Sequence, residues 1–376
     1  MKRRTVVIVL TVAAFVPLSA AAAPSQARPT LPQTASFEQL SRAAERARNA
    51  NRDDGAIRLY QQALKLQPEW EQGLWYVSAL LYQKERYSEA RDLLRRFVAL
   101  QPNSGPGWAL LGMSEFQTRE YARALDHFRQ GMTLGVGGSK GMAQSLFYFA
   151  AVLLTRFEMY DESLRLQFEM ARSGQAESFL VEPAGLAALR MPLLPAEIPP
   201  DRREMIRWAG QAALAVNTQR YDDAEKLLRN MVETHPNEPG VHFLFGAYLL
   251  NVRPADGVRE MQRELEISPS HVPARVRLAE EYVEEGKLDQ GRSLAEEAVK
   301  LDPQDASTHL AYGEALGAQG DLTGAIRELE TARDQAPEIM KIRWALFRAY
   351  TSAGRSEQAR QEKAAIEKLT QPPAQR

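Results

Sequence analysis

The chain contains five histidines, the residue type most often used for proton transfer and metal binding near neutral pH. None of them lies at a spacing from another histidine or a carboxylate that is typical of a metal site. We therefore interpret them as surface or capping residues and expect no metal and no other cofactor. They are His127, His235, His242, His271 and His309.

A glycine-rich stretch, Gly135–Gly141, contains the residue types of a phosphate-binding loop in a different order. A P-loop needs Gly-Lys-Ser/Thr after four intervening residues, with a strand before it and a helix after it. Here the order is Ser139-Lys140-Gly141, and no strand is expected before it. We interpret the stretch as a turn between two repeated units. A helix start is expected after it, which leaves weak anion binding as an alternative.

Several pairs of adjacent glutamates could be considered as a general acid and base. Adjacent residues on a helix do not face each other, so such pairs are typical of a solvated helix face. No serine or threonine lies in a recognisable nucleophile turn. The sequence therefore predicts a protein that is not an enzyme. The pairs are Glu280-Glu281, Glu284-Glu285 and Glu296-Glu297.

Composition excludes further classes of protein. The formal net charge of −1 argues against a nucleic-acid-binding protein, which would need a basic surplus to contact phosphates. The chain has no cysteine, so disulfides and thiolate zinc sites are excluded. Its 376 residues are too many for one compact core and predict several domains or a repeat array.

The first 27 residues have the pattern of a signal peptide. Lys2, Arg3 and Arg4 precede an apolar run from Thr5 to Leu18, and small residues follow at 20–23. We expect cleavage after residue 23 or 27, and an exported protein that is periplasmic or secreted. An uncleaved membrane anchor is the alternative, because residues 5–23 are barely long enough to span a bilayer. Residues 28–36 are expected to form a flexible segment.

The rest of the chain repeats itself with a period of 34 residues. Several prolines follow this spacing, among them Pro68 and Pro102, and Pro269, Pro303 and Pro337. A small residue recurs at the eighth and at the twentieth position of almost every unit, where two antiparallel helices can approach closely. The units begin near Phe37, Glu71, Gly105, Gln144, Met205, Pro239, Val272, Ala306 and Met340.

Two of these units resemble the tetratricopeptide repeat (TPR) at its marker positions. The third unit carries Trp108, Gly112, Tyr121 and Ala124 at the expected places, and the eighth, from Ala306, matches nearly as well. The resemblance implies an all-α, right-handed solenoid of helix-turn-helix units. It does not imply one activity, because this fold binds many different partners.

Irregularities divide the predicted solenoid into two blocks. Residues 37–172 form the first, with about four repeats, and residues 205–369 form the second, with about five. Residues 173–204 carry five prolines and break the period, so we expect a connector with a short helix near Val181–Leu189. Its apolar residues predict docking on a repeat rather than a free linker. In the fourth unit Gln167 replaces a bulky apolar residue, and residues 370–376 are expected to form a disordered tail.

The resemblance implies a concave binding groove lined by the second, fifth, ninth, twelfth and thirteenth positions of each unit. Aromatic anchors at such positions are typical of peptide recognition, although packing against a neighbouring repeat is an equal alternative. We therefore predict a scaffold or adaptor that binds a protein or peptide, with assembly of an envelope complex as a candidate process. A binding subunit for glycan-related machinery is the alternative. The predicted groove residues are Trp75, Tyr82, Met113, Phe116 and Tyr148 in the first block, and Phe243, Asn251 and Trp344 in the second, together with the polar residues Asn217, Glu280, Glu284, Glu314 and Arg348.

Overall fold

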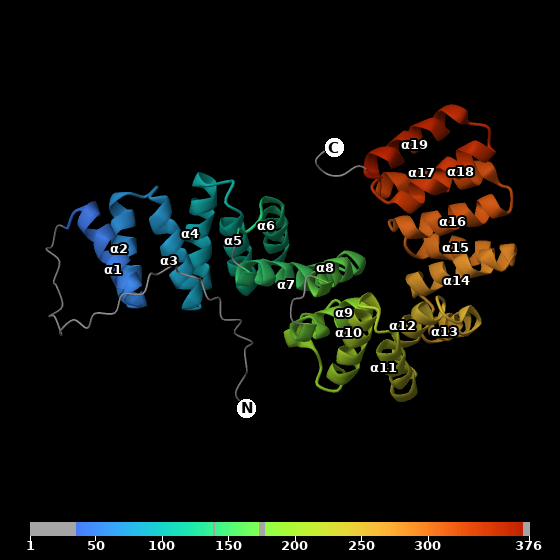
Figure 1. Cartoon of the computed structure of the whole chain (residues 1–376), viewed down its shortest axis with the longest axis horizontal. Coiled ribbons are helices and arrows are strands. Elements are labelled where there is room, and N and C mark those ends of the chain that lie inside the picture. The colour runs from blue at the N-terminus through green and yellow to red at the C-terminus, as the bar shows by residue number, and fades with distance from the viewer. Residues whose placement is uncertain (1–34, 138–139, 173–176, 371–376) are drawn as a thin grey trace. The chain divides into compact units, whose positions relative to one another are not determined.

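The computed structural model describes residues 35–137, 140–172 and 177–370 (Figure 1). Within these ranges the chain forms nineteen α-helices and two short 3-10 helices, and no strand. The predicted all-α solenoid is therefore confirmed. The expected signal peptide, residues 28–34 of the flexible segment and residues 371–376 of the tail lie outside the described residues.

The chain divides into two compact units, residues 1–203 and 204–376. In unit 1, four helical hairpins are followed by a single helix. The hairpins are α1 (Phe37–Asn49) with α2 (Asp53–Leu66), α3 (Glu71–Gln83) with α4 (Tyr87–Leu100), α5 (Gly105–Gln117) with α6 (Tyr121–Leu134), and α7 (Lys140–Arg156) with α8 (Tyr160–Arg172); the single helix is α9 (Val181–Ala188).

Unit 2 contains five hairpins. They are α10 (Arg203–Asn217) with α11 (Tyr221–Thr234), α12 (Val241–Leu249) with α13 (Pro254–Ile267), α14 (Val272–Glu284) with α15 (Leu288–Leu301), α16 (Ala306–Ala318) with α17 (Leu322–Gln335), and α18 (Met340–Ser352) with α19 (Ser356–Thr370).

Each hairpin closes on small residues, as the repeat pattern predicts. A Cβ atom added to Gly112 would lie 2.7 Å from the Phe128 ring, and one added to Gly313 would lie 2.7 Å from the Leu329 side chain. Ala124, at the twentieth position of the same unit as Gly112, is fully buried. The two helices of a hairpin can therefore pack closely only because these positions carry little or no side chain.

The turn within most hairpins contains a residue in the left-handed conformation. Eight of the nine described hairpins have one at their fifteenth position. Unit 2 uses Gly286, Gly320 and Gly354 in its last three hairpins, where glycine adopts a positive φ without strain. The others use Asn51, Glu85, Arg119, Glu158 and Gln219.

At four junctions in unit 2 and one in unit 1, a side chain at the fourth position holds the turn between successive hairpins. Trp108 donates from Nε1 to the Pro102 carbonyl at 2.8 Å, and Arg343 donates from Nε to the Pro337 carbonyl at 2.7 Å. Arg275 makes the same contact with Pro269. His242 and His309 make it through Nε2 with the carbonyls of Pro236 and Pro303, at 2.9 and 3.0 Å.

In unit 2 the same fourth-position side chains also pair with a carboxylate on the second helix of their hairpin. His242 Nδ1 lies 2.5 Å from Glu260, and His309 Nδ1 lies 2.8 Å from Glu328. Arg343 pairs with Glu362 at 2.9 Å. These side chains therefore tie the turn to both helices.

Three of the five histidines differ from the expectation of surface or capping residues. His242 and His309 are buried and paired. In unit 1, His127 Nδ1 lies 2.6 Å from the fully buried Glu115. Only the packing of two helices brings these partners together, so their sequence spacing does not reveal them. His271 has the expected capping role, because its Nδ1 accepts a hydrogen bond from the Ala274 amide at the start of α14.

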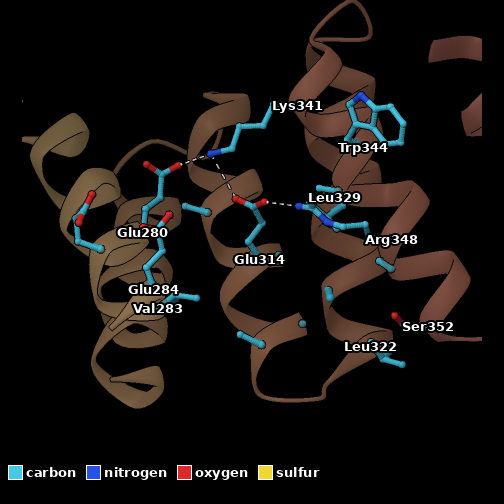
Figure 2. Close-up of a pocket in the computed structure, with 18 of the residues that line it drawn as sticks. Glu280, Val283, Glu284, Glu314, Leu322, Leu329, Lys341, Trp344, Arg348 and Ser352 are labelled. Carbon is cyan, nitrogen blue, oxygen red and sulfur yellow. Dashed lines mark hydrogen bonds and ion pairs between the residues drawn. The ribbon is translucent and has the colours of Figure 1, made fainter. Parts of the chain in front are cut away.

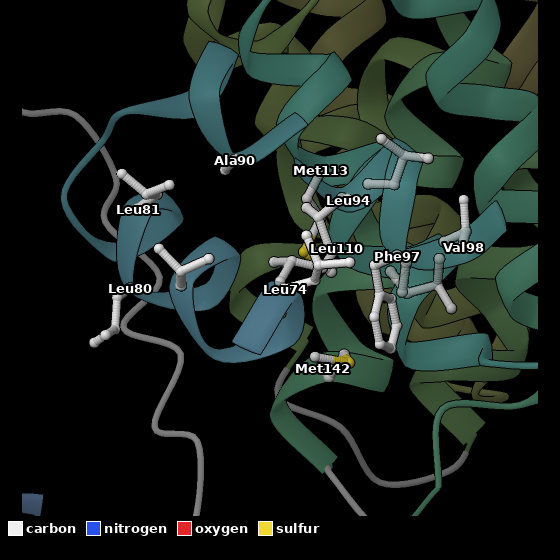
Figure 3. Close-up of a cluster of buried hydrophobic side chains, with 14 of the residues drawn as sticks. Leu74, Leu80, Leu81, Ala90, Leu94, Phe97, Val98, Leu110, Met113 and Met142 are labelled. Carbon is white, nitrogen blue, oxygen red and sulfur yellow. The ribbon is translucent and has the colours of Figure 1, made fainter. Parts of the chain in front are cut away.

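Stacking of the hairpins in unit 1 buries a continuous core from α1 to α7. Figure 3 shows Leu74, Leu94 and Leu110 in this cluster, contributed by α3, α4 and α5. Each hairpin leaves one apolar face bare, and the next hairpin covers it. This explains why the apolar residues of a single unit could not form a stable core alone.

Two details at the end of unit 1 differ from the sequence interpretation. Helix α7 begins at Lys140, so its start lies four residues before Gln144 and includes part of the glycine-rich stretch. Gln167 is fully buried and donates to Ser163 Oγ at 3.0 Å. Ser163 in turn donates to the Ala151 carbonyl at 2.8 Å, so a hydrogen-bonded chain replaces the expected apolar contact.

The Pro-rich connector packs within unit 1. Helix α9 forms part of it and contacts both α7 and α8. Leu180 and Leu186 are buried, and the Phe179 ring lies 6.0 Å from the Tyr148 ring. We find helix α9 of the connector docked on the fourth repeat, in the place that the first helix of a further repeat would take.

We expect Gly112→Leu to lower the free energy of unfolding by about 1–3 kcal/mol, because the new side chain would overpack the seam against Phe128. Gly141→Ala is the control: it lies in α7 and a Cβ atom there would meet nothing within 4 Å. This change should stabilise the helix by up to about 1 kcal/mol. Chemical denaturation followed by circular dichroism measures both. Equal effects of the two changes would contradict the close approach.

The pairing of His242 predicts a pH-dependent stability. Burial alone would lower its pKa, but its contacts with Glu260 and the Pro236 carbonyl outweigh burial and raise the pKa above 6.5. The stabilisation is therefore fully present below about pH 6.5, the value for the unfolded chain, and is lost as the pH rises through the raised pKa.

His242→Arg tests this effect, because Arg275 and Arg343 hold the same position in other repeats. We expect the free energy of unfolding to fall less between pH 6 and pH 8 in the variant than in the parent, since arginine keeps its charge. Denaturant titrations at the two pH values provide the comparison. The same pH slope in both proteins would show that His242 is not charged in the folded state.

Candidate functional site

A groove lies on the face of unit 2 formed by the first helices of its last three hairpins. Successive first helices contact one another, α14 with α16 and α16 with α18, and so form the inner layer of the solenoid. The groove encloses about 720 Å³. We call it the unit 2 groove. Its charged and aromatic lining is Arg277, Glu280, Glu281, Glu284, Glu314, Lys341, Trp344 and Arg348, and its apolar lining includes Val283, Ala311, Leu322, Leu329, Ala345 and Ala349.

Ion pairs connect the walls of this groove. Lys341 on α18 places its Nζ 2.7 Å from Glu280 on α14 and 3.5 Å from Glu314 on α16 (Figure 2). Arg348, seven residues further along α18, lies 2.9 Å from the other oxygen of Glu314. Arg277 pairs with Glu280 at 3.1 Å. All three cations of the groove therefore have carboxylate partners.

The charge of Lys341 is stabilised in this position. Burial alone would lower its pKa, but the hydrogen bond and charge of Glu280 and the charge of Glu314 outweigh burial and raise the pKa. Lys341 is therefore a fixed cation that joins helices 61 residues apart in sequence. Because the side chain is about half exposed, solvent weakens the pairs, and their contribution to stability is small.

The α14 wall keeps carboxylates that are not neutralised in this way. Among the described residues no ion pair is formed by Glu281 or Glu284. Burial raises the pKa of Glu281, and the charges of Glu284, Glu280 and Glu285 raise it further, while Arg277 acts in the opposite direction. This wall is thus a region of negative potential beside an apolar floor.

Trp344 is the exposed aromatic residue of the groove. Its side chain is on α18 between Lys341 and Arg348, and 42% of the residue is exposed. It touches Phe347 in a T-shaped contact, with ring centroids 5.7 Å apart. A large part of the indole therefore remains available for a ligand, which is the arrangement of a recognition anchor.

The groove residues predicted in unit 1 lie instead in contacts between helices. The Trp75 ring is 5.5 Å from Phe97, and the Tyr82 ring is 5.2 Å from Tyr87. Burial raises the pKa of Tyr82. Met113 is fully buried and has no surface that a partner could touch.

Phe116 and Tyr148 are likewise half-buried among rings. Phe116 lies 4.7 Å from Phe149, and Tyr148 lies 5.3 Å from the same ring. Burial, with a smaller effect of Glu182, raises the pKa of Tyr148 to about 12. These rings meet one another at tilted or edge-on angles. Stacking on a glycan would instead need ring faces that lie flat along an open surface.

Phe243 and Asn251, two of the residues predicted for the groove of unit 2, lie outside it. Phe243 packs on the His271 ring at 4.7 Å and belongs to the core around α12–α14. Asn251 is exposed and donates from Nδ2 to the Ala247 carbonyl at 2.9 Å. Trp344 is therefore the one aromatic or amide residue of the prediction that the structure places in this groove, where it joins Glu280, Glu284, Glu314 and Arg348.

Three charged residues that line the groove were not predicted as groove residues. Lys341 occupies the second position of its repeat, so the register that indicated Trp344 and Arg348 could also have indicated it. Arg277 and Glu281 line the groove from the sixth and tenth positions, which the register does not assign to it. Glu280 was interpreted as part of a solvated pair as well as a groove residue; its ion pairs place it in the groove.

The residues that the structure describes contain neither a metal-binding cluster nor a helix that could span a membrane. No group of three or more histidine, aspartate or glutamate side chains in that part of the chain could hold a metal ion. No described helix is both long and apolar enough to cross a membrane.

The chain is similar to known proteins in two respects: its sequence matches family models, and its fold matches solved structures. Two family models, both described as "Tetratricopeptide repeat", match the chain. One matches residues 41–105, 78–132 and 276–338, and the other matches residues 316–375. No curated protein sequence matches the chain.

Among solved structures, the chain is similar to several titled MamA. The "MamA RS-1 ArsTM double mutant" is 18% identical over 43% of this chain and 92% of that chain, with a TM-score of 0.38. A MamA AMB-1 structure is 22% identical over 43% and 96%, with a TM-score of 0.37. "MamA 41-end from Desulfovibrio magneticus RS-1" is 18% identical over 43% and 90%, with a TM-score of 0.36. These similarities concern the fold alone.

The family matches fall in both units and together cover about half of the chain. They include the hairpins α14 to α19 that build the unit 2 groove. The chain therefore belongs to the tetratricopeptide-repeat family.

Proposed function

We propose that the chain is an exported, non-catalytic adaptor that binds a peptide segment of a protein partner in the unit 2 groove. Assembly of an envelope complex is the process in which we expect it to act. Export is supported by the signal-peptide pattern of residues 1–27. Protein binding is supported by the fold, whose inner face offers an extended concave surface.

The observation that carries the proposal is the exposure of Trp344 in a groove that already has both an apolar floor and charged walls. An aromatic anchor beside polar groups is typical of a peptide site, because the ring supplies contact area and the charges fix the orientation of the chain. The groove spans three first helices, so it suits an extended or helical segment better than a small compact ligand.

Site-specific photocrosslinking tests the groove as the binding face. A photoreactive residue at Ala318, which is exposed and lines the groove, should crosslink a defined peptide segment of a partner in the native envelope fraction. The same residue at Lys363, exposed on α19 and outside the groove lining, is the control. Mass spectrometry identifies the segment.

We expect the Ala318 crosslink to be lost when Trp344→Ala is added, since the anchor is removed, while circular dichroism shows an unchanged fold. A crosslinked segment that forms equally well from Lys363, or that survives Trp344→Ala unchanged, would contradict binding in the groove.

Export is tested separately by the mature N-terminus. We expect protein from the periplasmic or secreted fraction to begin after residue 23 or 27, as read by N-terminal sequencing, because small residues precede both positions. An intact N-terminus in the membrane fraction would instead indicate the uncleaved anchor.

A further inference from the structure

The unit 2 groove contains more acidic than basic side chains, and this excess bears on the kind of ligand that it can bind. Four carboxylates and three cations line it. Each of the three cations has a carboxylate partner within the groove, as described above. Glu281 and Glu284 have no cation of their own among the described residues, and they lie on the same wall, α14.

Lys341 shows how this groove holds a cation. Its ammonium group lies between Glu280 and Glu314, 2.7 and 3.5 Å from their oxygens. The Glu284 carboxylate follows Glu280 by one helical turn on the same face of α14, and Figure 2 shows it directed into the same space. A second cation that enters from a partner would meet a similar carboxylate that is still unpaired.

An anionic ligand meets the opposite situation. To bind Arg348, an anion would have to displace Glu314, and to bind Lys341 it would have to displace Glu280 and Glu314. The displaced carboxylates are partly buried and would be left without a partner. The anion would also approach Glu281 and Glu284, which would repel it. The charge pattern therefore favours a positively charged ligand.

We propose that the unit 2 groove recognises a segment of a protein partner that carries arginine or lysine, whose cationic group binds Glu281 and Glu284 on α14 while apolar parts of the segment contact Trp344 and the floor. The inference rests on the proposed function, because it names the chemistry of the peptide bound there. Val283 and Leu322 provide apolar surface for the aliphatic part of such a side chain.

A display library of random 12-residue peptides tests the composition of the ligand without assuming a sequence. The full mature chain is the bait, at about 150 mM salt so that long-range attraction is screened. We expect the selected peptides to be enriched in arginine and lysine relative to the library. The enrichment should disappear when Glu281→Gln and Glu284→Gln are combined in the bait.

The matched control combines Glu233→Gln and Glu367→Gln, which change the net charge by the same amount. Both residues are exposed on second helices of unit 2, outside the groove. The control should keep the enrichment, so a general attraction of basic peptides to an acidic protein is distinguished from binding in the groove. Thermal unfolding confirms that the variants fold.

Fluorescence anisotropy with one selected peptide then measures the effect. We expect the dissociation constant to rise at least about tenfold in the Glu281→Gln/Glu284→Gln protein, and to change less than about twofold in the control. Equal losses in both proteins would overturn the proposal, because they would show only non-specific attraction.

Two other results would overturn this inference without contradicting the proposed function, which the photocrosslinking experiment at Ala318 tests separately. Enrichment of acidic or neutral peptides that still need Trp344 would show a peptide groove of different specificity. Absence of any enrichment, together with a partner segment crosslinked at Ala318, would show a groove that recognises something other than a basic segment.

Discussion

One contact recurs at five junctions between described hairpins: a side chain at the fourth position of a repeat donates a hydrogen bond to the proline carbonyl six residues before it. Proline ends the preceding helix, and the donor then fixes the direction in which the next helix starts. Tryptophan, histidine and arginine all make this contact, so its geometry is kept while its chemistry varies. Because the turn is fixed, successive first helices lie side by side and can form a groove.

The same backbone plan leads to different inner faces in the two units. In unit 1 the aromatic residues at the groove positions pack on rings of neighbouring helices, as Phe116 does on Phe149, and this burial stabilises the stack. In unit 2 several groove positions of the last three repeats carry charges, which are costly to bury in a core and line the groove instead: Glu280, Glu284, Glu314, Lys341 and Arg348. The residue types at a few positions thus decide whether the inner face is core or site.

Most of the fold could be predicted from the sequence because its determinants are local and periodic. Small residues such as Gly112 and the proline spacing predicted the hairpins, and most first helices begin within two residues of the expected position. The start of α7 was missed because the glycines before it suggest a turn, although Lys140 and Gly141 are helical. The pairing of His242 with Glu260 was missed because it depends on how two helices pack.

The candidate site was harder to predict, since the register of a repeat indicates the direction of a side chain but not what covers it. Met113 and Trp344 both occupy groove positions, yet one is fully buried and the other 42% exposed, because only the former has neighbouring helices that fill the space above it. Fold and site therefore depend on separate positions. The fourth, eighth and twentieth positions hold the helices, whereas the charged positions of the groove carry side chains whose ion pairs contribute little to stability. Such a separation lets one solenoid acquire a new ligand by substitution on its inner face alone.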